Sequence, residues 1–517
     1  MSQLFARKTV AELTAQASGG PGGEGQGLKR VMGRWELTAL GVGAVIGAGI
    51  FATTGSAIAG EAGVRPGAGP AIVLSFLLTA VTCGLAALCY AEFAAMVPVS
   101  GSAYTYAYAS LGELVAWIIG WDLIIEYAVG NIAVAISWAG YFRELVGLAG
   151  IDIPPWLVTD YRTAFQAAAS VAGGATDPAT LDLAAATTTA PHVFGLPIIL
   201  NLPAVLIVVA ITALLVYGIR ESSFSNTVLV VLKVGILMFF VAVGLFFIDP
   251  THYTAHGGFA PNGFAGVSTA AAIIFFSYIG FDAVSTAAEE AKNPARDVPF
   301  GIIASLVACT LIFILVAAVM VGMADWRELG TAEPLLTALN LAEGSPALLG
   351  FSRVLVAIGA VVAMTTVLLV FQLGQPRIFF SMARDGLLPP WAAKIHPRFR
   401  TPHVTTILTG AFVAVFAAFA NINEVVDLTN IGTLFAFLLV SAGILVLRRK
   451  EPDRVRPFRT PFVPVVPILS IVTCLYLMLQ LPLVTWIRFG LWLAIGLVIY
   501  FLYGYPRSRL RSAAAGR

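Results

Sequence analysis

The sequence predicts an all-α polytopic membrane protein with twelve membrane-spanning helices. Of the 517 residues, 58% are hydrophobic and only 11% are charged, whereas soluble domains carry about 25% charged residues. The mean hydropathy of the chain is +0.88. A span needs about 20 mostly apolar residues. Twelve stretches qualify: 37–59, 70–96, 109–140, 197–218, 225–247, 268–290, 300–323, 351–373, 404–420, 429–447, 462–482 and 488–504.

The distribution of positive charge predicts the orientation of these spans. If the N-terminus is cytoplasmic, 23 Lys and Arg residues fall on the inside and six fall on the outside. Because inside loops are enriched in Lys and Arg, we expect both termini to be cytoplasmic, in a bacterial inner membrane. Residues 1–34 lack an apolar signal-peptide core, so they are predicted to form a flexible cytoplasmic arm. Residues 505–517 are predicted to form a cytoplasmic tail.

The spans divide into two halves of five, residues 35–247 and 268–447, followed by two further spans within 462–504. Because each half holds an odd number of spans, the first and sixth stretches cross in opposite directions, and the halves would be inverted.

Two loops between the spans stand out by composition. The long outside loop, from about 145 to 197, contains the Ala/Thr-rich part 175–191, which is expected to be a loosely packed cap without chemistry. The inside loop 375–403 is amphipathic and mixed in charge, so it is predicted to form a helix on the membrane surface.

The first span carries four glycines: Gly41, Gly43, Gly47 and Gly49. Each costs about 1 kcal/mol against alanine in a helix interior. Two explanations fit: a half-helix end turned to a ligand site, or close helix packing of the Gly-xxx-Gly kind. The sixth span is interrupted as well, near Asp282. Interruptions at corresponding places in two halves favour the ligand site.

Three motifs carry a resemblance to a known family. They are Gly43-Ala-Val-Ile-Gly-Ala-Gly-Ile-Phe51, the run from Tyr90 to Tyr106, and the run from Phe276 to Glu290, which continues through Lys292-Asn-Pro. With them the chain resembles the amino acid–polyamine–organocation superfamily, and within it the cationic amino acid transporter family and its bacterial relatives. The resemblance implies the five-plus-five inverted repeat of the leucine-transporter type, with discontinuous helices 1 and 6 and two added C-terminal helices.

A zwitterionic amino acid needs donors for its carboxylate and acceptors for its ammonium. The start of a half-helix offers free N–H groups and a positive dipole end, and the end of one offers carbonyl groups. By resemblance, the predicted substrate-binding residues are Val45, Ile46, Gly47, Ala48, Gly49, Ile50, Phe276, Ser277 and Ile279. Phe276 matches the position that closes the family's site from outside, although an aromatic residue in a membrane helix often only packs.

Lys233 is a lone cation inside the fifth span. It could snorkel to the interface, or it could mark an ion path. In proton-coupled relatives a lysine here takes the place of the sodium ion that other relatives hold between spans one and eight. The resemblance therefore makes Thr365 and Thr366 expected neighbours and predicts that transport does not need sodium.

Asp282 and Glu126 are carboxylic acids in the middle of spans, and Asp122 lies one turn from Glu126 on the same face. Burial and mutual repulsion penalise their charged forms, which suits reversible protonation. Static pairing with neighbouring polar groups is the alternative. The resemblance favours Asp282 and Glu126, with Lys233, as the proton-coupling residues.

These observations predict a secondary transporter that imports amino acids with protons by alternating access. No second buried acid near the predicted site presents itself to a cationic side chain, and Leu368 in the eighth span is expected to keep that wall apolar, so neutral L-amino acids of small to medium size are favoured. Cationic amino acids are the alternative, followed by polyamines, exchange, or a transporter-like amino acid sensor. No nucleotide motif, metal-ligand pattern or catalytic constellation is present, so no enzyme activity, cofactor, metal or nucleic-acid partner is expected. The partners implied are the substrate, protons and lipid; a small membrane protein partner is not identifiable.

Two further expectations concern smaller features. The four cysteines, Cys83, Cys89, Cys309 and Cys474, all lie in apolar spans and are expected to be packing residues without disulfides. Glu289 and Glu290, close to Lys292, are expected to form either an ion-paired cytoplasmic latch or a solvated helix end.

Overall fold

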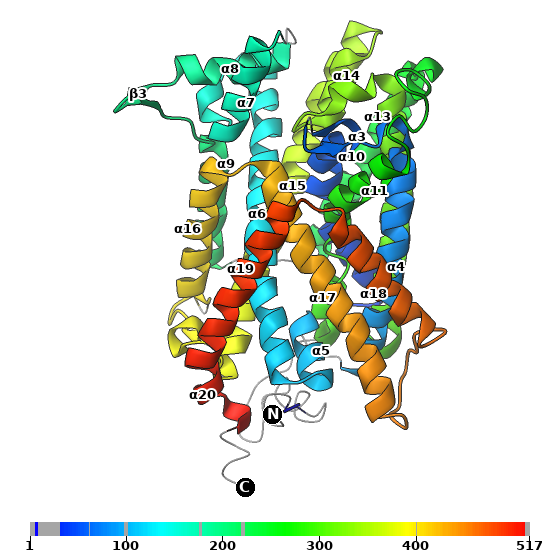
Figure 1. Cartoon of the computed structure of the whole chain (residues 1–517), viewed down its shortest axis with the longest axis vertical. Helices are drawn as coiled ribbons and strands as arrows, with labels where there is room; N and C mark the ends of the chain where they lie inside the picture. The colour runs from blue at the N-terminus through cyan, green and yellow to red at the C-terminus, as the bar shows by residue number, and fades with distance from the viewer. Residues whose placement is uncertain are drawn as a thin grey trace.

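The computed structural model describes residues 6–8, 32–61, 63–97, 102–174, 178–218, 223–399 and 401–511, and these residues form a tall bundle of helices (Figure 1). Within them, nine helical segments are long and apolar enough to cross a membrane. Three shorter apolar helices coincide with the fourth, ninth and eleventh predicted stretches. Every predicted stretch therefore overlaps an apolar helical segment.

The nine long segments consist of α2 (Arg34–Val45), η2 (Gly49–Thr53) and α3 (Thr54–Ala59); η3 (Gly69–Ala71) and α4 (Ile72–Met96); α6 (Glu113–Leu148); α10 (Ser223–Gly244) and η5 (Leu245–Phe247); α11 (Gly263–Ile274), η7 (Phe275–Tyr278) and α12 (Ala283–Thr286); α13 (Pro294–Met323); α15 (Pro346–Arg384); α17 (Ile422–Lys450); and α19 (Leu483–Ile499), η11 (Tyr500–Gly504) and α20 (Tyr505–Arg507). The three shorter apolar helices are α9 (Leu202–Tyr217), α16 (His403–Phe419) and α18 (Val465–Leu479). The other helices are α5 (Ser102–Ser110), α7 (Tyr161–Ala172), α8 (Pro178–Thr189), α14 (Pro334–Leu341), η4 (Pro155–Leu157), η6 (Pro250–Tyr253), η8 (Ala288–Glu290), η9 (Trp326–Leu329) and η10 (Pro390–Ala393). Two hairpins pair β1 (Gly60–Glu61) with β2 (Arg65–Pro66) and β3 (His192–Val193) with β4 (Leu196–Pro197).

The two interrupted helices lie in the interior of the bundle. In the most apolar window of the segment Gly263–Ser285, 89% of the residues are buried, against 22% for Leu483–Arg511 at the periphery. The segment Arg34–Ala59 is similarly enclosed, at 78%. The continuous segment Glu113–Leu148 is enclosed to a similar degree, at 83%. Both broken helices are thus largely shielded from lipid, and irregular backbone is tolerated where it is buried in protein.

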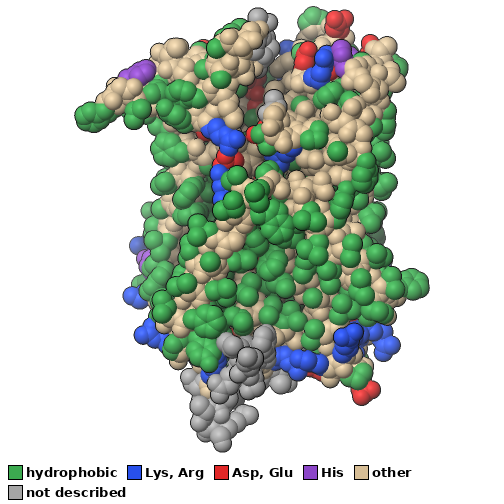
Figure 2. Space-filling model, in the orientation of Figure 1, with side chains coloured by type: hydrophobic (Ala, Val, Ile, Leu, Met, Phe, Trp, Pro, Cys, Tyr) green, Lys and Arg blue, Asp and Glu red, His purple; other side chains and the backbone are tan. Residues whose placement is uncertain are grey.

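The surface of the bundle has an apolar middle and charged ends. Figure 2 shows hydrophobic side chains over the middle of one face, Lys and Arg at the end where the chain begins and finishes, and charges of both signs near the other end. We call the end that holds Lys8 and Arg511 the terminal end, and the end that holds α7, α8 and α14 the loop end (Figure 1).

Both loops predicted from composition are more ordered than expected. Most of the Ala/Thr-rich part forms α8, because alanine has the highest helix propensity. This helix packs on α7 through Ala164 and Ala186. Arg143 of α6 binds Asp182 of α8 at 2.5 Å. The prediction of a loosely packed cap is therefore wrong.

The prediction of a surface helix at 375–403 is also wrong. Instead, α15 continues without a break to Arg384 and is followed by a short 3₁₀ turn, η10. The reason is tertiary: the amide of Gln375 donates a hydrogen bond to the Ile124 carbonyl at 3.0 Å, which fixes this stretch against α6.

The remaining expectations are met in part. All four cysteines are buried and free. The predicted arm falls largely on residues 1–5 and 9–31, and the end of the tail on 512–517, outside the described residues. The side chain of Glu289 is outside them as well. Glu290 acts through its backbone, because its carbonyl accepts from the Met32 N–H at 3.0 Å and Met32 in turn accepts from the Lys292 N–H at 2.8 Å. This pairing ties the start of α2 to the segment after α12.

Candidate functional site

The two breaks lie against each other in the middle of the bundle. α2 ends at Val45, and Ile46 turns the chain into an extended conformation, with φ −75° and ψ 100°. In the other segment, η7 is followed by Ile279 in an extended conformation and by Gly280 at φ +116°. A Cβ on Gly280 would lie 2.9 Å from the Ala44 carbonyl oxygen, so only glycine allows this approach.

The glycines of the first span are used for close packing as well as for the break. A Cβ on Gly47 would lie 2.6 Å from Cγ2 of Val367 on α15. A Cβ on Gly49 would overlap the Cα of Ser277. Close packing is therefore observed at Gly47 and Gly49, where protein atoms occupy the adjacent space, and the ligand site stays a prediction.

The predicted substrate-binding residues are brought together, and all of them are buried. Ser277 meets Gly49 across the two breaks, and its hydroxyl has no hydrogen-bond partner among the described residues. Phe276 is 5% exposed at the same level. The described conformation is thus closed around the breaks. The nine residues in question are Val45, Ile46, Gly47, Ala48, Gly49, Ile50, Phe276, Ser277 and Ile279.

Lys233 points inward and caps the end of α2. Its Nζ donates to the carbonyl oxygens of Gly43 at 2.8 Å and Ile46 at 3.2 Å, and the residue is 2% exposed. Snorkelling to the interface is therefore not what the structure shows. An ammonium at the negative end of a half-helix is a favourable electrostatic arrangement.

This contact alters two expectations about Lys233. The Ile46 carbonyl, predicted to receive the substrate ammonium, already accepts a hydrogen bond from the lysine. The hydroxyls of Thr365 and Thr366 donate to carbonyls of their own helix, at 2.7 Å each, and Thr365 also accepts from Trp138. The hydrogen bonds described for Lys233 thus run to the first span.

Glu126 and Asp282 line one narrow cavity with residues of both breaks. The cavity has room for about one water molecule, and its walls include Ala44 and Gly280. Glu126 also faces the Thr433 hydroxyl of α17. The structure thus places both predicted proton-coupling acids directly beside the broken backbone; the full lining is Ala44, Glu126, Tyr127, Ile279, Gly280, Asp282, Ala283, Val370 and Phe371.

Asp122 lies one turn from Glu126 and faces Gly432 of α17. It is completely buried, and neither carboxyl oxygen has a hydrogen-bond partner among the described residues. Two acids on adjacent turns of α6 therefore share the interface with α17. A buried acid without a hydrogen-bond partner is costly when charged, so Asp122 joins Glu126 and Asp282 as a candidate for protonation.

At the loop end, an ion pair that the sequence analysis missed joins the hairpin after the first span to α17. Arg65 in β2 donates to Asp427 at 2.7 Å, and its Nε lies 3.6 Å from Glu61. Both partners of the short pair are nearly fully buried. Glu424, one turn before Asp427, pairs with Arg488 at 2.8 Å. Charged residues at the ends of apolar stretches could have indicated the site, but not which residues pair.

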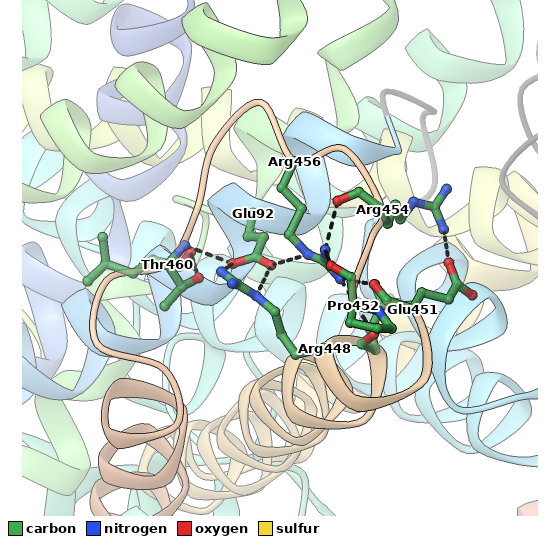
Figure 3. A network of polar contacts seen from close by, with 9 residues as sticks. Glu92, Arg448, Glu451, Pro452, Arg454, Arg456 and Thr460 are labelled. Atoms are coloured by element: carbon green, nitrogen blue, oxygen red, sulfur yellow. Dashed lines mark hydrogen bonds and ion pairs between the residues drawn. The ribbon is translucent and has the colours of Figure 1, made fainter.

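At the terminal end, a second missed network surrounds Glu92 at the end of α4 (Figure 3). Arg448 binds both carboxylate oxygens at 2.8 Å, Arg456 approaches within 3.2 Å, and the Thr460 N–H donates at 2.7 Å. Glu92 is completely buried. The loop between α17 and α18 is therefore fixed onto α4.

The described parts of both termini are anchored at this end too. Lys8 binds Asp385, after α15, at 2.6 Å, and Tyr104 donates to the same carboxylate at 2.7 Å. Arg511 binds Glu113, at the start of α6, at 2.6 Å. Lys8 and Asp385 are both buried, so this part of the predicted flexible arm is a packed element.

Among the described residues, no three His, Cys, Asp or Glu side chains are grouped closely enough to hold a metal ion. The polar groups that are available are carbonyl and N–H groups at the breaks, one ammonium and three carboxylic acids. Such a set can bind a small zwitterion and exchange protons.

Comparison with known proteins shows which family the chain belongs to. The model of the family "Amino acid permease" matches residues 32–502. The branched-chain amino acid permease BcaP of Bacillus subtilis is 43% identical over 508 residues, covering 98% of this chain and 99% of that protein. The methylthioribose transporter of Bacillus subtilis is 41% identical, covering 99% of this chain and all of that protein. The vacuolar cationic amino acid transporter 4 of Arabidopsis thaliana is 34% identical over 88% of this chain and 68% of its own length.

Proposed function

This chain belongs to the amino acid permease family and is a transporter of amino acids, and we propose that it imports neutral amino acids together with protons. The proposal includes twelve spans arranged as five plus five inverted spans and two more. It places the terminal end in the cytoplasm of a bacterial cell, in line with the 23 Lys and Arg residues on that side against six on the other.

The observation that carries the proposal is the shared cavity of Glu126 and Asp282 beside both breaks. A substrate held by the backbone at the breaks would lie close to the acids that take up the proton. Because a ligand shifts a conformational equilibrium only by its differential affinity for the two states, coupling requires substrate and proton to favour the same state. A shared location provides a direct route for such a preference.

The preference for neutral substrates rests on the wall of α15 that faces the first break. Val367 contacts Gly47, and Leu368 is completely buried. An aliphatic wall favours an apolar substrate side chain and offers no counter-charge to a cationic one. The similarity to a permease named for branched-chain amino acids supports the same preference.

A cationic substrate is the second candidate. Three acids are buried, Asp122 and Glu126 on α6 and Asp282 at the start of α12, and one of them could receive a cationic side chain. In that case the acid would be used for binding and would be unavailable for proton coupling.

Uptake into proteoliposomes tests the proposal. The purified full chain is reconstituted and assayed with leucine, valine, alanine, lysine, arginine and methylthioribose, under an inward proton gradient and then under a sodium gradient. We expect accumulation of neutral amino acids with the proton gradient, loss of accumulation with a protonophore, and no stimulation by sodium.

The variant Asp282→Asn provides the specific control for coupling. It should retain exchange of labelled for unlabelled substrate but lose accumulation driven by the proton gradient. Unchanged gradient-driven accumulation in this variant would refute the coupling role of Asp282. Preferred uptake of lysine or arginine would favour the cationic alternative, and binding without any uptake would favour a sensor.

A further inference from the structure

Each broken helix is held at its end by one polar side chain from another helix. Lys233 of α10 donates to the carbonyls of Gly43 and Ile46 at the end of α2. Asn430 of α17 donates from Nδ2 to the carbonyls of Ala272 at 2.7 Å and Ile273 at 3.1 Å, near the end of α11. Both side chains are almost fully buried. The sequence analysis singled out the lysine but not the asparagine.

The two contacts occupy corresponding places in the two halves of the chain. α10 is the fifth predicted span and holds the first; α17 is the tenth and holds the sixth. This correspondence rests on the five-plus-five arrangement of the proposed function. Two independent residues that cap the two breaks in the same way indicate a shared mechanical requirement.

The carbonyls bound by Asn430 need a donor for a local reason. α11 changes into the tighter 3₁₀ turn η7 directly after Ile274. At such a change of helix type, carbonyl groups lose well-aligned partners in their own helix. The Ile273 carbonyl also accepts from the Phe275 N–H, and the amide nitrogen of Asn430 adds hydrogen bonds to this carbonyl and to that of Ala272. In a buried site a poorly bonded carbonyl is costly, so these added hydrogen bonds stabilise the end of α11. Two carbonyl acceptors also fix which amide atom is the nitrogen, because the amide oxygen cannot donate.

We infer that Asn430 is a positioning residue that fixes the inner end of α11, so that the carbonyls of Phe276, Ser277 and Ile279 are presented to the substrate. Those residues follow the capped carbonyls of Ala272 and Ile273 by only three to seven positions. The chemistry of the two caps differs: an ammonium can release a proton, whereas an amide cannot. Asn430 therefore sets the substrate affinity without taking part in proton coupling.

The decisive variants replace Asn430 by two side chains of nearly the same size. Asn430→Leu removes every donor. Asn430→Asp removes the donors while the acid is ionised and restores one O–H donor when it is protonated. The measurement is the apparent KM for substrate exchange in proteoliposomes, given as the ratio of variant to wild type between pH 5 and pH 8.

For Asn430→Leu we expect the ratio to be about ten or more at every pH, since two buried carbonyls lose their donor. For Asn430→Asp we expect a similar ratio at pH 8 that falls towards one at pH 5. A residue that only fills space would not produce this pH-dependent recovery. The matched control is Ser441→Ala on the same helix, whose buried hydroxyl pairs with Ser470 and should leave KM unchanged.

Amide hydrogen exchange of residues 275–281 gives a readout that needs no substrate. Exchange should be faster in Asn430→Leu than in wild type and unaffected in Ser441→Ala. The inference would be overturned if the KM ratio of Asn430→Leu to wild type were one. It would also be overturned if Asn430→Asp and Asn430→Leu gave equal ratios at all pH values. If the wild-type protein transports no amino acid, the proposed function fails. The amide hydrogen exchange rates alone then still decide whether Asn430 holds α11.

Discussion

On the proposed five-plus-five arrangement the first and the second break occupy equivalent places, but their residues differ in chemistry. The first is rich in glycine, packs directly against Val367 and Ser277, and is capped by the charged Lys233. The second is rich in aromatic residues, contains Asp282, and is capped by the neutral Asn430. In the first break almost all polar groups are backbone atoms, whereas the second places an acid in the cavity next to Glu126.

This difference indicates that the two breaks have different roles. A glycine-lined break approaches its neighbours closely, so its geometry depends on every added carbon atom. A break that carries an acid can respond to a proton. On the proposed function, the first break mainly positions the substrate, and the second joins positioning to proton binding. The following changes test that distinction.

The largest effect is expected from adding one carbon atom to the first break. Gly49→Ala places a Cβ onto the backbone of Ser277, which cannot move away as a side chain can. We expect uptake to be abolished with the protein still present in the membrane. Gly235→Ala is the matched control, because a Cβ there meets no atom within 4 Å. Normal uptake by Gly49→Ala would show that the two breaks are not in tight contact during transport.

A rescue experiment separates local crowding from general damage. Gly47→Ala also should abolish uptake, because the new Cβ meets Cγ2 of Val367. Since this neighbour is a side chain, Val367→Ala should restore part of the activity in the double variant. The same pair of measurements tests Gly47 as a predicted substrate contact, because a residue that must remain glycine for the substrate would not be rescued.

The next effect is expected from removing the charge that caps the first break. Lys233→Met leaves the carbonyls of Gly43 and Ile46 without their charged donor. Since hydrogen bonds to charged groups contribute about 1.5–3 kcal/mol, initial uptake should fall by roughly 10- to 100-fold. Val231→Met on the lipid-exposed side of the same helix is the control. Uptake by the variant that depends on added sodium would indicate that the lysine replaces a cation site.

The sequence revealed the breaks better than it revealed what holds them. Four glycines in one span and Asp282 in another are unusual in apolar helices, so both interruptions were visible. Lys233 was visible for the same reason. Asn430 was not, because an asparagine in a membrane helix has no single typical role. The pair of Arg65 and Asp427 joins residues 362 positions apart, and only the fold brings them together.

The local sequence also misjudged segments whose structure depends on distant contacts. The alanine-rich part of the long loop was expected to be loose, but α8 packs on α7. The stretch after Gln375 was expected to be a separate surface helix. It is instead part of α15, which the hydrogen bond from Gln375 to the Ile124 carbonyl fixes against α6. Lys8 was assigned to a flexible arm, and it is buried against Asp385. In each case the decisive partner lies outside the window from which the prediction was made.

A moderate effect is expected from breaking the link between the hairpin after the first span and α17. Arg65→Gln and Asp427→Asn each leave one buried charge without its nearest partner, although Glu61 stays close to Arg65. Each variant should reduce uptake several-fold. A double-mutant cycle should give a coupling energy of about 1–2 kcal/mol, within the range for contacting residues. A coupling energy of zero would mean that the pair does not hold the loop end closed.

The smallest effect concerns Glu333, a half-buried acid directly before α14. The helix α14 packs on η2, which follows the first break. Burial, and then repulsion from Glu144, raise the pKa of Glu333 from 4.5 to about 7, while Arg143 opposes the rise and is itself paired with Asp182. Tyr141, on α6 together with Arg143 and Glu144, lies near Glu333 and donates a hydrogen bond to the Phe51 carbonyl.

Because the pKa of Glu333 is higher in the folded than in the unfolded state, its proton stabilises the folded protein at low pH. That contribution is complete below about pH 4.5 and is lost as the pH rises through about 7. Glu333→Gln, which stays neutral, should therefore raise the melting temperature in detergent by about 1–3 °C at pH 8 and leave it unchanged at pH 5. Glu328→Gln, at an exposed position of the same loop, should have no such effect. Equal shifts at both pH values would show that Glu333 does not titrate in this range, and the first break would then lack a proton-sensitive group at its outer end.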